Sequence, residues 1–158
     1  MKNVFQSLLT GLAFCLAGFN LSAAAAPVDW NVITTDTGAA VADCRDCDEN
    51  ISVLVVCDRG AKHRVVDLLL LEQREDALAG KSATVTVTAG KTTLSIAATY
   101  SQPGEAGPYP IARLASNDPF FELLSHATSA QLAVNGYATT MGLKGTRKAF
   151  TAMQKICP

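Results

Sequence analysis

The chain has 158 residues, and its 13 basic and 14 acidic side chains give a net charge of −1 at neutral pH. That length is enough for one domain with a real hydrophobic core. The charge balance lacks the basic excess typical of proteins that bind DNA or RNA, so we expect no nucleic-acid partner.

Residues 1–25 have the pattern of a signal peptide, with a basic start at Lys2, an almost uncharged stretch and a run of small residues at 22–26. The apolar core is shorter than the ~20 residues of a spanning helix, so we expect cleavage after Ala25 and no stable membrane insertion. Loss of Lys2 leaves 12 basic against 14 acidic residues, a charge of −2. We expect residues 26–158 to form one periplasmic or secreted domain without a cofactor, because that compartment is poor in nucleotides.

Runs of β-forming residues bounded by turn residues predict a series of short strands. We expect strands at 30–35, 51–57, 64–71, 84–88, 93–97, 132–134 and 137–139. The run at 51–57 is continuously apolar, which predicts a strand buried on both faces. Valine and threonine alternate at 84–88, so the valines should face the core. Asn135-Gly136 is the strongest hairpin signal, because both turn positions must take positive φ.

Two helices are predicted in the second half of the chain. Asp118-Pro119 can open a short helix over 120–125, since Asp accepts a bond from a free N–H group and proline is tolerated at the first position. A terminal helix can begin at Gly145-Thr146, with an apolar face that faces the core. Residues 101–110, with three prolines and two glycines, are predicted to form a surface loop.

Four cysteines lie outside the leader, namely Cys44, Cys47, Cys57 and Cys157. An even number of cysteines in an exported chain favours disulfides over free thiols, so we expect two bonds. We slightly favour Cys44–Cys47 with Cys57–Cys157, because a cysteine in a buried strand is well placed to receive the end of the terminal helix. The pairing Cys47–Cys57 with Cys44–Cys157 is nearly as good.

The same cysteines suggest two other chemistries. Cys44-x-x-Cys47 has the spacing of a redox pair, but the acidic residues on both sides of it destabilise a thiolate. Cys44, Cys47, Cys57 and His63 suit a tetrahedral zinc site, but an oxidising compartment disfavours it. We therefore predict structural disulfides and no metal site.

No other motif indicates catalysis. Asp46-x-Asp48-x-Asn50 matches the start of a calcium-binding loop, but Ile51 stands where that loop needs glycine. The chain has no Gly-x-Ser-x-Gly nucleophile elbow, and each of its two histidines, His63 and His126, is expected to be exposed to solvent. We predict no catalytic residue.

Two groups of basic residues remain as a candidate binding site. The first is predicted at a hairpin tip and the second at the start of the terminal helix. They are Arg59, Lys62, His63 and Arg64 in the first group, and Lys144, Arg147 and Lys148 in the second. If adjacent, the groups would form a patch suited to lipopolysaccharide, a sulfated glycan or an acidic protein. The alternative is a charged rim that keeps the protein soluble.

Three motifs together resemble the invasion-associated locus B family of exported bacterial proteins. An early strand carries Trp30, a middle strand ends in Leu54-Val55-Val56-Cys57-Asp58, and the chain closes with Met141-Gly142-Leu143-Lys144-Gly145 leading into a helix. The resemblance implies a β-rich, secreted or periplasmic protein with a role in host-cell invasion. It implies no catalytic residue.

We therefore expect a mainly β fold, an antiparallel β-sandwich or half-barrel with a short internal helix and a C-terminal helix. The function we expect is that of an exported, non-enzymatic protein that binds a protein or an anionic glycan at the cell envelope or host interface. One alternative is an inhibitor of a host hydrolase such as lysozyme, acting through Ser101–Pro110. Another is a thiol-disulfide oxidoreductase that uses Cys44 and Cys47. Sequence leaves the oligomeric state open.

Overall fold

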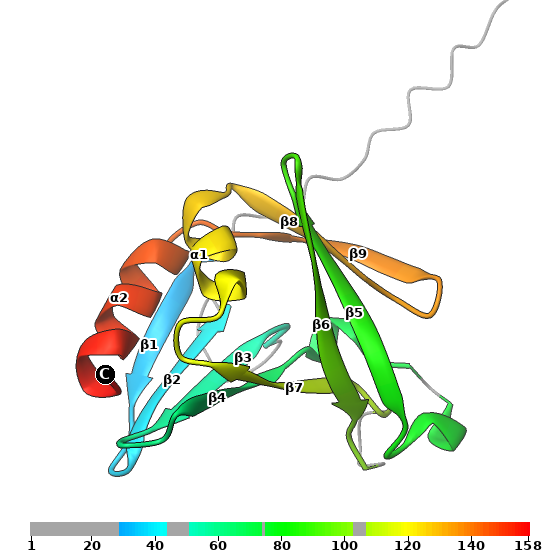
Figure 1. Ribbon diagram of the computed structural model, residues 1–158, viewed down its shortest axis with the longest axis horizontal. Helices are drawn as coiled ribbons and strands as arrows, with labels where there is room; N and C mark the ends of the chain where they lie inside the picture. The colour runs from blue at the N-terminus through cyan, green and yellow to red at the C-terminus, as the bar shows by residue number, and fades with distance from the viewer. Residues whose placement is uncertain (1–28, 44–50, 74, 103–106) are drawn as a thin grey trace, which may run out of the picture.

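The computed structural model describes residues 29–43, 51–73, 75–102 and 107–158. These residues form one antiparallel sheet with two α-helices at one end (Figure 1). The predicted signal peptide at 1–25 lies outside the described residues, as do Cys44 and Cys47.

The sheet has nine strands in the order β1-β2-β3-β4-β7-β6-β5-β8-β9. The strands are β1 (Trp30–Thr34), β2 (Gly38–Asp43), β3 (Leu54–Asp58), β4 (His63–Asp67), β5 (Ser82–Ala89), β6 (Thr92–Tyr100), β7 (Pro110–Ala115), β8 (Ser129–Val134) and β9 (Tyr137–Gly142). The helices are α1 (Pro119–His126) and α2 (Thr146–Ile156), and two short 3-10 turns are η1 (Leu69–Leu71) and η2 (Asp76–Leu78).

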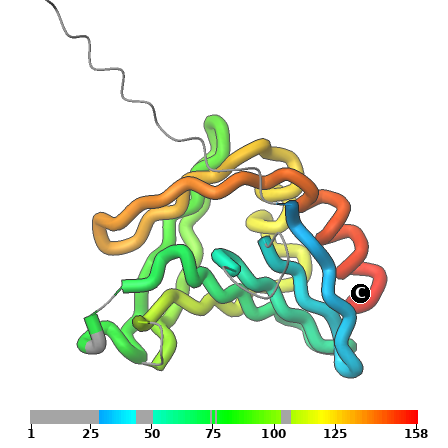
Figure 2. The backbone as a smooth tube through the Cα atoms, turned by 180° about the vertical axis from the view of Figure 1, so that it is seen from behind, coloured from blue at the N-terminus to red at the C-terminus, as the bar shows by residue number. Residues whose placement is uncertain are grey.

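The sheet curls into a half-barrel, which Figure 2 shows from behind. α2 packs against β1 and β2, and α1 packs against α2 and β5, so both helices cover the same end of the curled sheet. The predicted class, a mainly β antiparallel fold with a short internal helix and a C-terminal helix, is confirmed. Among the described residues, no helix is both long and apolar enough to span a membrane.

The pairing between β6 and β7 is short. It consists of Thr99 opposite Ile111 and Tyr100 opposite Pro110, whereas β5 and β6 pair along their length from Ser82 to Ala89. The sheet is therefore two halves, β1-β2-β3-β4-β7 and β6-β5-β8-β9, joined at a narrow β6–β7 seam.

The core follows the alternation of the strands. Val85 and Val87 of β5 are fully buried, as their pattern predicts, while Thr84 is exposed. The helices add Phe120, Phe121 and Leu124 from α1, and Ala149, Phe150 and Met153 from α2. The core therefore lies between the concave side of the sheet and the two helices.

Trp30 joins the two edges of the half-barrel. Its backbone N–H donates to the carbonyl of Lys144 at 3.2 Å, and its Nε1–H donates to the carbonyl of Gly142 at 3.0 Å. Its ring packs on Phe150 of α2 with centroids 5.8 Å apart. Trp30 is buried in the core, with an exposed fraction of 5%, and it also ties β1 to the end of β9.

Local signals at turns and caps are confirmed. Asp118 Oδ1 accepts a hydrogen bond from the N–H of Phe120 at 2.9 Å and so caps α1. Asn135 and Gly136 both have positive φ, 49° and 80°, in the turn between β8 and β9. These short-range features depend on neighbouring residues alone, which is why the sequence predicts them.

Two strands were not predicted. β2 is rich in glycine and alanine, which have low strand propensity, yet all six of its residues are buried. A Cβ at Gly38 would collide with the carbonyl oxygen of Cys57, so close packing against β3 requires this glycine. β7 begins at Pro110, inside the segment predicted to be a loop.

Two predicted strands are shorter or more exposed than expected. β4 ends at Asp67 and gives way to the 3-10 turn η1 at Leu69–Leu71, so the prediction of a strand over 64–71 was wrong at its end. In β3, Val55 and Cys57 are buried while Leu54 and Val56 are partly exposed. The strand therefore has one core face, and the prediction of burial on both faces was wrong.

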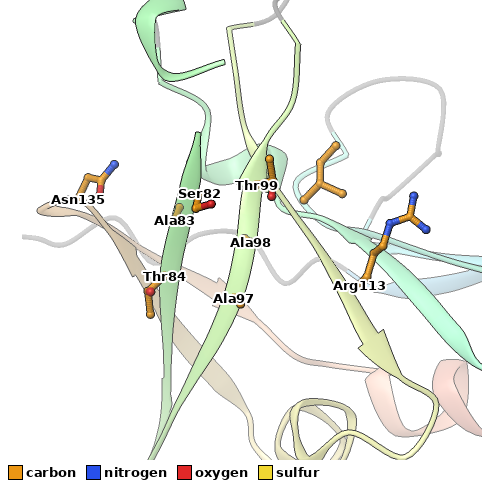
Figure 3. Close-up of a pocket in the computed structure, with 9 residues that line it drawn as sticks. Ser82, Ala83, Thr84, Ala97, Ala98, Thr99, Arg113 and Asn135 are labelled. Atoms are coloured by element: carbon orange, nitrogen blue, oxygen red, sulfur yellow. The ribbon is translucent and has the colours of Figure 1, made fainter. Parts of the chain in front are cut away.

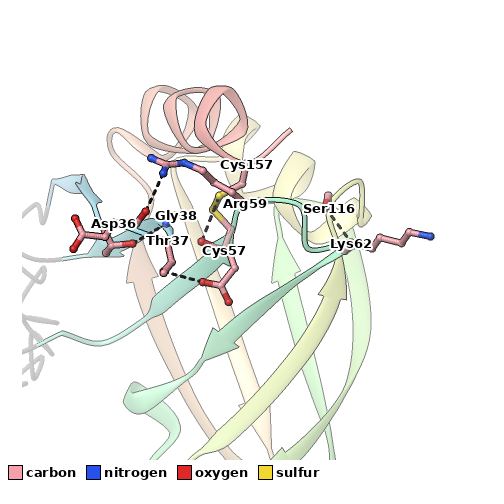
Figure 4. The surroundings of a disulfide bond; sticks show 10 residues. Asp36, Thr37, Gly38, Cys57, Arg59, Lys62, Ser116 and Cys157 are labelled. Atoms are coloured by element: carbon pink, nitrogen blue, oxygen red, sulfur yellow. Dashed lines mark hydrogen bonds between the residues drawn. A yellow bond between two sulfur atoms is a disulfide. The ribbon is translucent and has the colours of Figure 1, made fainter.

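The disulfide Cys57–Cys157 is present, with Cα atoms 6.3 Å apart (Figure 4). It joins the buried face of β3 to the residue that caps the C-terminus of α2. Both cysteines are 3% exposed. The favoured pairing of Cys57 with Cys157 is confirmed.

Replacing both Cys57 and Cys157 by alanine should lower the free energy of unfolding by roughly 4 kcal/mol, because their bond closes a loop with a sequence separation of 100. Urea unfolding followed by Trp30 fluorescence measures the change. The matched control is the double variant Cys44→Ala/Cys47→Ala. The bond predicted between these two cysteines would close a far shorter loop, so its removal should cost less. Equal losses in the two variants would contradict the loop-entropy explanation.

Two carboxyl groups are shielded from water, Asp43 almost fully and Asp67 in part. Asp43 is 4% exposed, and its Oδ1 accepts hydrogen bonds from the N–H groups of Ser52 and Val53 at 2.9 and 2.6 Å. Burial nevertheless raises the pKa of Asp43. Burial also raises the pKa of Asp67 on β4. The pKa of Tyr109 is raised by its own burial and, to a lesser extent, by the charge of Asp67.

Asp67→Asn should raise the free energy of unfolding at pH 7. Because the pKa of Asp67 is raised in the folded state, the folded protein binds this proton more tightly than the unfolded chain. The stability from protonation is complete below the unfolded pKa of ~3.9 and is lost as pH rises through the folded pKa. Asp67→Asn should therefore be more stable than the wild type at pH 7 and equally stable near pH 3. Urea unfolding at the two pH values would measure the difference.

The control for that comparison is Asp36→Asn, at an exposed turn. It makes the same chemical change at a solvent-exposed carboxylate, and it should raise the free energy of unfolding at pH 7 by less than Asp67→Asn does. An Asp67→Asn variant that is less stable than the wild type at pH 7 would contradict the prediction, because it would mean that the folded protein stabilises the charged carboxylate.

Candidate functional site

α2 is held rigidly on the sheet. At its start, Thr146 is buried and its hydroxyl lies 2.7 Å from the carbonyl oxygen of Leu124 and 2.9 Å from that of Leu143. Gly145 precedes the helix with a φ of 93°, which favours glycine. The other end is fixed by the disulfide of Cys157. The side chains on the outer surface of α2 are therefore presented from a fixed backbone.

The outer surface of α2 is basic. Arg147, Lys148 and Lys155 are exposed, and the helix contains no acidic residue. At about 100° per residue, these three side chains fall within roughly a third of the helix circumference. We call them the basic face of α2. Lys148 and Lys155 form no hydrogen bond or ion pair with any of the described residues.

The first predicted basic group lies near the C-terminal end of α2. Arg59, Lys62 and His63 are exposed around the turn between β3 and β4. Arg59 Nη1 donates to the backbone carbonyl of Asp36 at 2.9 Å, and Figure 4 shows Arg59 beside the Cys57–Cys157 bond. These three residues remain available to a partner.

Arg64 was also predicted in that group, and its placement in an exposed patch was wrong. It is 1% exposed and points into the core from β4. Successive side chains of a strand point to opposite faces of the sheet. Because His63 faces the solvent, Arg64 must face the core.

The second predicted group lies at the start of α2. Lys144 forms an ion pair with Asp29 at 2.9 Å, in which both side chains are largely exposed. Arg147 Nη2 lies 2.8 Å from His126 Nδ1, and its Nε donates to the carbonyl of Ser125 at 3.3 Å. Since Arg147 can only donate, Nδ1 of His126 accepts. Lys148 extends the group along the helix.

The two basic groups are not adjacent, because α2 separates them. A helix of eleven residues is about 16 Å long. Lys155, which was not among the predicted site residues, lies two turns beyond Lys148 and partly fills this interval. The spacing of seven residues between two exposed lysines on a predicted helix was the signal that could have identified it.

A cleft lies between α1 and α2. Its volume is about 460 Å³, and its walls include Phe121, Phe150 and four charged or titratable residues. These four are Asp118, Glu122, His126 and Arg147. The cleft therefore opens beside the basic face of α2 and shares Arg147 with it.

A second depression, of about 790 Å³, lies on the outer face of β5, β6 and β7 (Figure 3). Small residues such as Ser82, Ala97 and Thr99 line it, and Arg113 is the charged residue among its nine lining residues. This surface is wide and open, without convergent polar groups.

The loop predicted as an inhibitory element is anchored at its base. Ser101 N–H donates to the carbonyl of Tyr109 at 2.8 Å, and Tyr109 N–H donates to Ser101 Oγ at 3.1 Å. Residues 103–106, at its centre, lie outside the described residues. The proposed redox pair, Cys44 and Cys47, also lies outside them.

Within the described ranges, no three His, Cys, Asp or Glu side chains are arranged so that they could hold a metal ion. Of the predicted zinc candidates, Cys57 is bonded to Cys157, and the sulfur is therefore not a thiolate ligand.

No protein-family model, no curated protein and no solved structure matches this chain. Any function must therefore be inferred from the structure of the chain itself.

Proposed function

We propose that this protein is an exported, non-enzymatic binding protein that holds an anionic partner against the basic face of α2. The observation that carries the proposal is the gathering of Arg147, Lys148 and Lys155 on one exposed helix surface without a carboxylate. The chain as a whole is slightly acidic, so this positive charge is local. A local field of this kind steers and orients a charged partner.

The anchoring of α2 supports the same proposal. Side chains on a fixed helix lose less freedom on binding than side chains on a loose segment, so less affinity is lost to ordering. Thr146 at one end and the disulfide at the other provide that rigidity. Arg59 adds positive charge near the C-terminal end of the helix, whereas the charge of Lys144 at the other end is offset by Asp29.

The partner we propose is an acidic protein or an anionic glycan at the cell envelope or the host interface. A periplasmic or secreted location follows from the predicted signal peptide, and an exposed basic surface suits both kinds of partner there. Membership in the invasion-associated locus B family stays a prediction from three sequence motifs.

The double variant Lys148→Gln/Lys155→Gln should elute from a heparin column at lower salt than the wild type, because it loses two unpaired charges of the basic face. The matched control is Lys81→Gln/Lys91→Gln, which removes the same charge from two exposed sites outside the basic face. Elution of the control should follow the wild type. Equal shifts for both variants would mean that net charge, and not the basic face, causes retention.

A further inference from the structure

Arg64 is the largest fully buried side chain among the described residues, with an exposed fraction of 1%. Its Nε and Nη1 atoms find no hydrogen-bond acceptor among them. The ion pair seen in the described ranges joins Lys144 to Asp29, and no carboxylate there is paired with Arg64. The guanidinium is therefore a buried positive charge without a counter-charge.

The neighbours of Arg64 are apolar. Leu114 of β7 lies directly across from it. On the other side of Arg64 lies Cys57 of β3. The register shows this, because Val56 pairs with Val65 and the two strands are antiparallel. Phe121 of α1 covers the guanidinium, whose Cζ lies 4.7 Å from the ring centroid. The ring attracts the cation, but it leaves the N–H groups without an oxygen acceptor.

Packing alone does not explain an arginine at this position. A leucine or methionine would fill the same space without a desolvated charge, and an unpaired buried charge opposes folding. The lowered pKa of Arg64 has burial as its cause and reflects that cost. An anion that reaches the guanidinium would supply the missing acceptors.

The cleft between α1 and α2 lies next to this guanidinium. Phe121 covers Arg64 and also lines the cleft. Arg64 itself does not line the cleft, because the ring of Phe121 stands between its guanidinium and the open space.

We propose that the α1–α2 cleft binds one carboxylate side chain of a protein partner, with Arg64 as its buried counter-charge and Arg147 at the opening. The proposal rests on the function proposed above, because the same partner would lie along the basic face of α2. Access to Nε and Nη1 requires the ring of Phe121 to turn aside, a rotamer change of the kind common at interfaces.

The charges of the cleft favour a single carboxylate over a polyanion. Asp118 and Glu122 line the same cleft as Arg147 and His126. With Arg64 behind Phe121, two arginines balance the two carboxylates, so the cleft has no net positive charge to hold a polyanion. One carboxylate can still be held by hydrogen bonds from the unpaired Nε and Nη1 of Arg64. An acidic side chain between neutral residues fits this balance, whereas a sulfated glycan does not.

The test is an NMR titration of the full chain with the peptide acetyl-Ala-Glu-Ala-amide, followed through the Nε–H signal of Arg64. The peptide acetyl-Ala-Gln-Ala-amide is the neutral control. We expect the glutamate peptide to shift the Arg64 signal and the glutamine peptide to leave it unchanged. Arg64→Met keeps the packing on Phe121 without the charge, and it should weaken binding at least about tenfold.

Arg113→Gln is the matched control, because Arg113 is exposed on the outer face of β7. It should bind the glutamate peptide like the wild type. Binding by Arg64→Met equal to the wild type, or no shift of the Arg64 signal in the wild type, would overturn the proposal. So would a shift caused by a heparin hexasaccharide and not by the peptide, which would identify a glycan as the occupant.

The two proposals can fail separately. Loss of heparin retention in Lys148→Gln/Lys155→Gln together with an unmoved Arg64 signal would support the basic face and reject the cleft. Unchanged retention with a peptide-induced shift of Arg64 would support the cleft and reject the basic face.

Discussion

The structure depends on how α2 is fastened to the first half of the sheet. The disulfide joins its C-terminal cap to β3, and Trp30 of β1 packs on Phe150 near its middle. These contacts bring together residues that are 100 and 120 positions apart in the chain. Without them the apolar face of α2 would keep its contact with α1 but lose its attachment to the first strands of the sheet.

Signals that depend on neighbouring residues were sufficient to predict much of the fold. The alternating valines of β5, the Asp118 cap and the Asn135-Gly136 turn were all identified from local chemistry. β2 was missed because its glycine and alanine residues are selected by a requirement from outside the segment, the close approach of Gly38 to β3. A single sequence does not reveal that approach before the strands are paired.

In the candidate site, too, the features set by neighbouring residues were predicted and those set by distant contacts were not. Exposed basic residues on α2 were predicted from helical periodicity, and Cys57 with Cys157 was the favoured pair. The position of Arg64 was predicted incorrectly, because its direction depends on the register of β4 against β7, with Arg64 opposite Leu114. The cleft itself arises where α1 and α2 meet, and these helices have no sequence pattern that predicts their contact.

The short pairing at the β6–β7 seam has a mechanical consequence. The two halves of the sheet share few backbone hydrogen bonds there, so relative motion of the halves meets less resistance at the seam than within either half. α1 follows β7 of one half and precedes β8 of the other, and it therefore bridges both. A partner bound between α1 and α2 would link the two halves across the seam. Binding at the surface would therefore restrict motion throughout the sheet.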